Sequence, residues 1–203
     1  MTMDRKKFII SSSLTAFALT TFGSIIKEAN GEFTGDCGTT NDILGPFYRP
    51  NAPIRSDLTY EGLKGTRIIL KGKVFKSDCT TVLQDALVEI WHCNSEGEYD
   101  NDTKEFRQRA SLNTNNKGEY SFTTILPGKY LNGELYRPSH IHYRVTEKNS
   151  KELISQIYFK GDPHITKDPW ASQDKAKFRI LQITPEDING NLTINFDIYL
   201  KEK

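Results

Sequence analysis

Residues 67–75 read RIILKGKVF and residues 86–93 read ALVEIWHC, and these two stretches decide the fold class. Both are rich in β-branched, aliphatic and aromatic side chains, and apolar residues alternate with lysine across residues 70–74. Such alternation is typical of a strand that buries one face and exposes the other. We therefore predict one strand in each stretch.

Further short stretches of the same character follow along the chain. They are residues 110–114, 119–125, 139–146, 153–159, 178–183 and 192–200. Turn-forming clusters of Asn, Gly and Pro separate several of them. Short strands at fairly regular spacing predict an all-β fold, a two-sheet β-sandwich with long loops and at most short helices. One short helix is expected within residues 168–177, and residues 31–203 are expected to form a single domain.

The composition of the 203-residue chain excludes several classes of protein. It has 27 basic and 26 acidic side chains, a net charge of +1, and 36% hydrophobic residues. This chain is too apolar and too balanced in charge to be disordered. It also lacks the basic excess that nucleic-acid binding requires, so no nucleic-acid partner is expected.

The first 30 residues differ from the rest. Arg5, Lys6 and Lys7 precede an uncharged, largely apolar stretch at residues 8–26. A basic start followed by an apolar run predicts an export signal, by either the Sec or the Tat route. The alternative is a membrane anchor, but hydroxyl side chains dilute the ~20 apolar residues that a span needs. We expect residues 1–30 to be a signal peptide, and the exported chain to keep no stable membrane anchor.

Three cysteines allow at most one intramolecular disulfide. If the first two strands pair as a simple antiparallel hairpin, Cys79 and Cys93 lie roughly 20 Å apart, beyond disulfide reach. A bridge, if one forms, is then expected between Cys37 and Cys79. Cys93 is expected to pack as a small apolar group.

His140 and His142 are the first candidates for chemistry. Alternate residues share one face of a strand, so both imidazoles can bind the same metal ion. For the sequence His140-Ile141-His142 taken alone, the alternative is that both histidines face solvent and bind no metal.

Five blocks of sequence surround this pair in a definite order. They are LGPFY (44–48), WHCNSEGEY (91–99), TNNKGEYSFTTILPGKY (114–130), YRPSHIHY (136–143) and SQIYFKGDP (155–163). The series resembles the intradiol ring-cleavage dioxygenases, the catechol and protocatechuate dioxygenases that use non-haem Fe(III). Its last part looks most like the iron-bearing subunit of protocatechuate 3,4-dioxygenase. The short segment before Leu44 is unlike the long helical N-terminal segment of the dimeric catechol enzymes.

The resemblance implies one Fe(III) ion per chain, held by Tyr99, Tyr130, His140 and His142. These residue types suit that ion, because hard anionic oxygen donors favour Fe(III) over Fe(II). A cation of this charge can also hold a tyrosine as phenolate at neutral pH, although its ordinary pKa is about 10.

The resemblance also implies the reaction. A catechol-type aromatic ring is cleaved by O2 between its two hydroxylated carbons, in the catabolism of aromatic compounds, giving a cis,cis-muconate-type product. Arg137 would stabilise negative charge on the ring, Tyr130 would help to take a proton, and Gln156 would lie beside the metal. Ile43, Pro46 and Tyr48 would line the substrate pocket. The partners implied are a small aromatic diol and O2, and a homo-oligomer is possible.

Other interpretations remain open from the residues alone. The same sandwich could be a non-catalytic, transthyretin-like carrier, or it could hold a hydrolytic zinc site on the two histidines. Tyr48 and Gln156 could serve packing or backbone hydrogen bonding, and we expect Trp91 and Tyr158 to pack. An iron–tyrosinate protein is coloured, whereas a carrier or a zinc enzyme is not.

Overall fold

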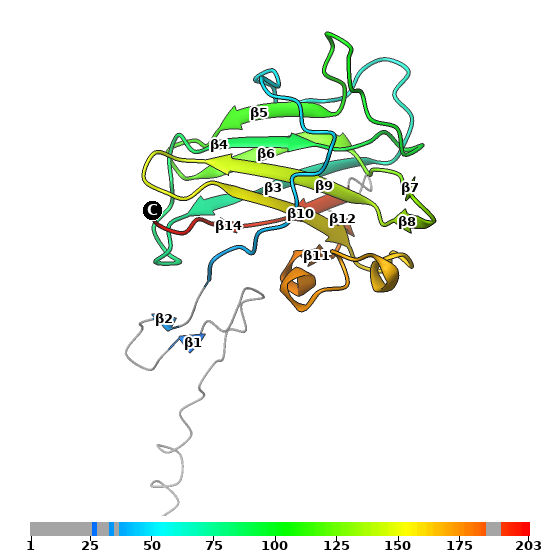
Figure 1. The fold of residues 1–203 in the computed structure, drawn as a ribbon. Helices are drawn as coiled ribbons and strands as arrows, with labels where there is room; N and C mark the ends of the chain where they lie inside the picture. Colours follow the sequence, from blue (N-terminus) through cyan, green and yellow to red (C-terminus); the bar gives the residue numbers. More distant parts are fainter. Residues whose placement is uncertain (1–25, 28–32, 35–36, 186–191) are drawn as a thin grey trace, which may run out of the picture.

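The structure, a computed structural model, describes residues 26–27, 33–34, 37–185 and 192–203. Two five-stranded sheets lie face to face as a β-sandwich (Figure 1), which confirms the predicted fold class. The predicted signal peptide lies outside the described residues, apart from strand β1 (Ile26–Lys27), which pairs with β2 (Phe33–Thr34). In the part of the chain that is described, no helix has the length and apolar character to cross a membrane.

The first sheet carries the predicted histidine pair. Its strands, in spatial order, are β11 (Ile180–Leu181), β10 (Leu153–Phe159), β9 (His140–Thr146), β4 (Leu87–Trp91) and β5 (Arg109–Asn113).

The second sheet is built around the long strand β3 (Arg67–Phe75). Its other members are β12 (Thr184–Pro185), β13 (Leu192–Asn195), β14 (Ile198–Tyr199) and β6 (Glu119–Ile125). A separate hairpin joins β7 (Tyr130–Asn132) to β8 (Leu135–Arg137). Two 3-10 helices, η1 (Ile165–Lys167) and η2 (Asp174–Arg179), follow β10.

Strand alternation decides which side chains of the first sheet enter the core. On β9, Ile141, Tyr143 and Val145 are fully buried in the core cluster. The intervening residues, His140 and His142 among them, therefore face away from the second sheet. The two histidines are nevertheless only 0% and 1% exposed, because loops cover this outer face.

Two predicted strands are wrong in part. Residues 178–183 were expected to be a strand, but η2 runs to Arg179 and only Ile180–Leu181 is extended. The guanidinium of Arg179 is buried and donates to the Asp42 carboxylate at 2.7 Å, so a tertiary ion pair overrides local strand propensity.

The expected strand at residues 192–200 is interrupted between β13 and β14. There the side chain of Asp197, rather than a backbone carbonyl, accepts the N–H of Lys73 at 2.9 Å. Gly72 lies opposite, and a Cβ at this position would be 2.0 Å from the carbonyl oxygen of Phe196. The chain can pass this close only because residue 72 lacks a side chain.

The predicted disulfide forms between Cys37 and Cys79, and Cys93 is free and buried. The expected hairpin between the first two strands is wrong, because β3 and β4 belong to different sheets. The bridge ties the start of the segment 37–48 to the loop after β3. That segment then crosses the outer face of the first sheet.

Candidate metal centre

The outer face of the first sheet brings chemically active side chains into register. His142 pairs with Trp91 on β4 and with Gln156 on β10, and His140 pairs with Tyr158 on β10. Registered residues on neighbouring strands present their side chains to the same face. The strands thus place both histidines and Gln156 in one patch.

Two tyrosines from loops complete the cluster. Tyr99 comes from the loop that follows β4, and Tyr130 begins β7. The ring centroid of Tyr130 lies 5.5 Å from that of His140 and 5.7 Å from that of Tyr99. The ring centroids of the two histidines are 5.0 Å apart. The hydroxyl of Tyr99 lies 3.5 Å from Nε2 of His140. All four predicted metal ligands therefore meet at one place.

The hydrogen bonding of the two imidazoles leaves nitrogen atoms free for a metal. Nδ1 of His140 lies 2.6 Å from the carbonyl oxygen of Pro138, so Nδ1 carries the proton and Nε2 faces the tyrosines. Both ring nitrogens of His142 are buried and have no hydrogen-bond partner among the described residues. A buried polar atom without a partner costs free energy. A metal ligated by His142 would remove that cost, so the residues fit a metal ion.

The donor set fits a hard, highly charged ion rather than zinc. Among the described residues, no group of three or more His, Cys, Asp or Glu side chains forms a metal site. The cluster instead pairs two imidazoles with two phenols, and zinc sites are normally built from Cys, His and carboxylates.

Burial controls the protonation of the four groups. It lowers the pKa of His140 to about 3 and that of His142 well below its usual range, so both imidazoles are neutral, as metal binding requires. Burial also raises the pKa of Tyr99 and Tyr130, so in the absence of a cation both phenols keep their protons. A highly charged cation would favour the phenolates and offset this effect.

The segment 43–48 forms one wall of the cluster. Gly45 has a φ of +75°, and a Cβ there would be 3.0 Å from Cε1 of His142. The Phe47 ring stacks on Tyr99, with centroids 4.2 Å apart. The carbonyl of Ile43 accepts a hydrogen bond from Nε2 of Gln156 at 2.9 Å, whereas Pro46 is exposed.

The predicted pocket residue Tyr48 points elsewhere. Its hydroxyl donates to Glu89 at 3.1 Å and accepts from Arg144 at 3.2 Å. Its ring packs on Trp91, which in turn stacks on His142 at a centroid distance of 4.8 Å. The indole therefore stands between Tyr48 and the histidine.

Arg137 reaches the cluster from the end of β8. Its Nη2 donates to Oε1 of Gln156 at 3.1 Å, and Arg137 is the register partner of Tyr130 in the β7–β8 hairpin. Burial raises the pKa of the Tyr130 phenol, and the positive charge of Arg137 lowers it in part. Arg137 therefore lies next to both of the other predicted catalytic residues.

Some residues around the centre were not anticipated from the sequence. These are Gly45, Phe47, Asp42, Asp168 and Trp170. Tyr158 packs as expected, but its hydroxyl also donates to Asp42 and lies 3.4 Å from Nη2 of Arg137. The sequence held a signal for Tyr158, because it follows Gln156 by two residues and so shares its face of the strand.

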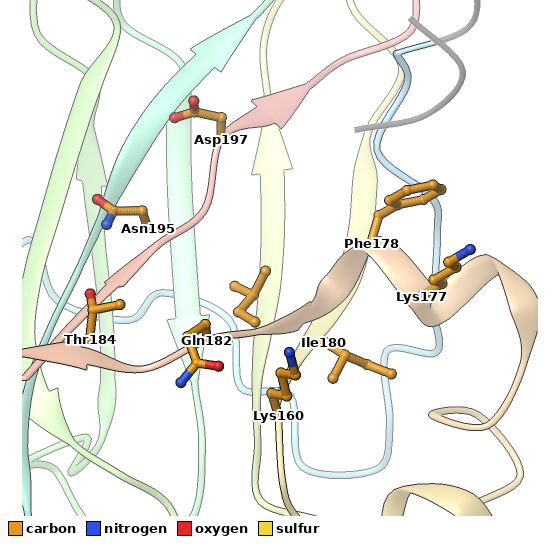
Figure 2. A pocket seen from close by; sticks show the side chains of 9 residues that line it. Lys160, Lys177, Phe178, Ile180, Gln182, Thr184, Asn195 and Asp197 are labelled. Carbon is orange, nitrogen blue, oxygen red and sulfur yellow. The ribbon is translucent and has the colours of Figure 1, made fainter. Parts of the chain in front are cut away.

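A hollow of about 660 Å³ lies elsewhere, at the edges of the two sheets (Figure 2). Lys160, Lys177 and Phe178 lie around it, with Gln182 and Asp197. None of the predicted site residues lines this hollow, so it is separate from the cluster of two tyrosines and two histidines.

Comparison with known proteins decides the family. Residues 43–202 match the family model described as "Dioxygenase". The protocatechuate 3,4-dioxygenase beta chain of Burkholderia cepacia is 30% identical over 80% of this chain and 72% of that protein. The chain belongs to the intradiol ring-cleavage dioxygenase family.

Two further dioxygenases are similar to this chain, one in sequence and one in structure. Catechol 1,2-dioxygenase 2 of Acinetobacter lwoffii is 32% identical over 70% of this chain and 59% of that protein. A solved dioxygenase domain, from a dioxygenase carbohydrate-binding protein fusion of Streptomyces sp. SirexAA-E, superposes with a TM-score of 0.71 at 25% identity. It covers 82% of this chain and 99% of that domain. The chain spans about three fifths of the length of the catechol 1,2-dioxygenases that it matches.

Proposed function

We propose that this protein is a non-haem Fe(III) dioxygenase that cleaves a catechol-type ring with O2 between the two hydroxylated carbons. The product would be of the cis,cis-muconate type. One observation carries the proposal: two tyrosines and two buried histidines converge, and both nitrogens of His142 have no partner among the described residues. Family membership supports the same reaction class.

The metal would be held by Tyr99, Tyr130, His140 and His142, one ion per chain. Fe(III) bound there would supply the positive charge that keeps both catechol hydroxyls deprotonated. The loss of these two protons would make the ring electron-rich. The histidines are fully buried, whereas the tyrosines are partly exposed, so substrate would approach from the tyrosine side.

The remaining chemistry falls to side chains of this chain. Tyr130, as phenolate, would accept a proton from a substrate hydroxyl. Arg137, held 3.1 Å from Gln156, would place a fixed positive charge beside the ring where negative charge develops. Phe47 and the backbone of residues 43–46 would exclude water from one side of the substrate. Tyr48 would act indirectly, by supporting Trp91.

Iron loading and oxygen uptake test the proposal. Purified, iron-loaded protein should be red-brown and should consume O2 with catechol, protocatechuate or hydroxyquinol. Tyr130→Phe and His142→Ala should lose or greatly weaken both properties. Tyr136→Phe and His164→Ala, which change the same residue types nearby, are the matched controls and should keep them. Protein that stays colourless after iron loading, or full activity in His142→Ala, would contradict the proposal.

We also propose that the protein is exported and meets its aromatic diol outside the cytoplasm. The basic start and apolar run within residues 1–30 support this. Deletion of residues 1–30 should abolish export, and unchanged export of the deleted form would contradict it. The mass of the exported protein by light scattering would establish whether it forms a homo-oligomer.

A further inference from the structure

Arg137 forms a buried ion pair with Asp168, which is not one of the proposed metal ligands. Nε of Arg137 donates to Oδ2 of Asp168 at 2.7 Å, and Nη2 lies 3.4 Å from Oδ1. The two side chains are only 3% and 1% exposed. Two parallel N–H···O contacts of this kind restrict the guanidinium in both position and plane.

Asp168 is itself held rigidly. Its Oδ1 accepts the backbone N–H groups of Trp170 at 3.0 Å and Ala171 at 2.7 Å. The carboxylate is therefore fixed by the turn that follows η1. Its position does not depend on a flexible side-chain rotamer alone.

Two aromatic residues complete the cradle around the guanidinium. The indole ring of Trp170 lies 4.4 Å from Cζ of Arg137, a distance typical of a cation–π contact. The single hydroxyl proton of Tyr158 is directed to Asp42, at 2.9 Å, because a carboxylate is the strongest acceptor within reach. The oxygen of Tyr158 is then left as an acceptor for Nη2 of Arg137, at 3.4 Å.

We propose that Asp168 is the positioning residue for Arg137, with Trp170 and Tyr158 as supports. The inference rests on the proposed function, in which Arg137 faces negative charge that develops on the ring. A preorganised charge stabilises a transition state only where it is already in place. A displacement of about 1 Å can cost about 100-fold in rate. The side chain of Asp168 makes no hydrogen bond to the four proposed metal ligands among the described residues. The turn that carries Asp168 thus controls the rate of ring cleavage through Arg137.

A thermal-stability cycle tests the pairing without any need for iron. Asp168→Asn keeps the shape of the side chain and removes its charge, and Arg137→Met removes the partner. Each single change should lower the Tm on the order of 10 °C, because it leaves a buried charge unpaired. The double variant should lose little more than either single variant. Additive losses would overturn the pairing.

Kinetics of the iron-loaded protein test the positioning role. Asp168→Asn should lower kcat about 100-fold. It should change KM by less than about threefold and keep the visible colour and anaerobic catechol binding, because the ligands are intact. Tyr158→Phe should lower kcat by about tenfold and serves if Asp168→Asn does not fold. An unchanged kcat in a folded variant would overturn the proposal.

Two matched controls separate positioning from general destabilisation. Tyr120→Phe removes a buried tyrosine hydroxyl that bonds the carbonyl of Phe196 in the second sheet. Thr114→Val removes a buried hydroxyl that accepts the N–H of Ala86 at 3.0 Å and donates to the carbonyl of Leu83 at 2.6 Å. Both should lower the Tm and leave kcat unchanged, and an equal loss of kcat in them would overturn the proposal. If the wild-type protein binds no iron or takes up no O2, the proposed function fails, while the stability cycle still reports on the pair.

Discussion

The imidazole of His142 lies flat against the indole of Trp91, with ring centroids 4.8 Å apart and planes 11° apart. Trp91 is 2% exposed and is the register partner of His142 on the adjacent strand. The stacking fixes the plane of a ring whose two nitrogens make no hydrogen bond among the described residues. The orientation of this proposed ligand is therefore set by packing.

Replacement of Trp91 should reduce iron affinity. Trp91→Leu removes the stacking surface and leaves a cavity, so we expect about 10–100-fold weaker iron binding and about 3–5 kcal/mol lower stability. Trp91→Phe keeps an aromatic face and should recover most of the affinity. Competition with a chelator measures the affinity, and equal iron binding in the Leu and Phe variants would contradict the argument.

Gly45 should be intolerant of a side chain for two separable reasons. Its φ of +75° strains any L residue, and its Cβ would be 3.0 Å from Cε1 of His142. Gly62 provides a matched control, because its φ is +81° and nothing lies within 4 Å of its Cβ position. Both alanine variants should lose about 1 kcal/mol of stability from backbone strain. Only Gly45→Ala should also weaken iron binding, and an equal effect in Gly62→Ala would refute the contact.

The sequence predicted the centre better where local geometry decides it than where long-range packing does. Strand alternation predicts that His140 and His142 share one face, whereas the motif resemblance implies that these two residues bind the metal together with Tyr99 and Tyr130. Asp168 could not be predicted, because it lies 31 residues from Arg137 in an irregular turn that has no periodicity.

The incorrect strand at residues 178–183 has the same origin. Local propensity favours β structure there, but the ion pair between Arg179 and Asp42 spans 137 residues and is invisible to a local pattern. Tertiary contacts of this kind decide short, irregular segments. The roles of Arg137, Gln156 and the pocket residues remain predictions.

His92 should make stability depend on pH. It is 1% exposed, with Nδ1 2.7 Å from the carbonyl of Cys93 and Nε2 2.8 Å from Oγ1 of Thr124. Burial lowers its pKa from 6.5 to about 4, so the folded protein holds this imidazole neutral while the unfolded chain protonates it first. Its contribution to stability is complete above pH 6.5, is lost as the pH falls toward 4, and changes no further below that. At 1.36 kcal/mol per pH unit, the loss is about 3 kcal/mol.

Urea denaturation of the wild type and His92→Gln between pH 4 and 7.5 measures this loss. Glutamine retains a donor and an acceptor but does not titrate in this range. The stability difference between the two proteins should shrink as the pH falls, since the other titrating groups are common to both. Parallel curves would show that His92 is not the source.

The disulfide should stabilise the wall of the metal centre as well as the fold. Cys37 and Cys79 are separated by 42 residues, and closing a loop of this length removes unfolded-state entropy worth about 4 kcal/mol. Reduction should therefore lower the Tm by about 10 °C. The Cys37→Ser/Cys79→Ser variant should show the lower Tm from the outset and should not respond to reductant. Because residues 43–47 reach the cluster only six residues after Cys37, both forms should also bind iron more weakly. A reductant-induced Tm shift that persists in the double variant would place the effect elsewhere in the protein.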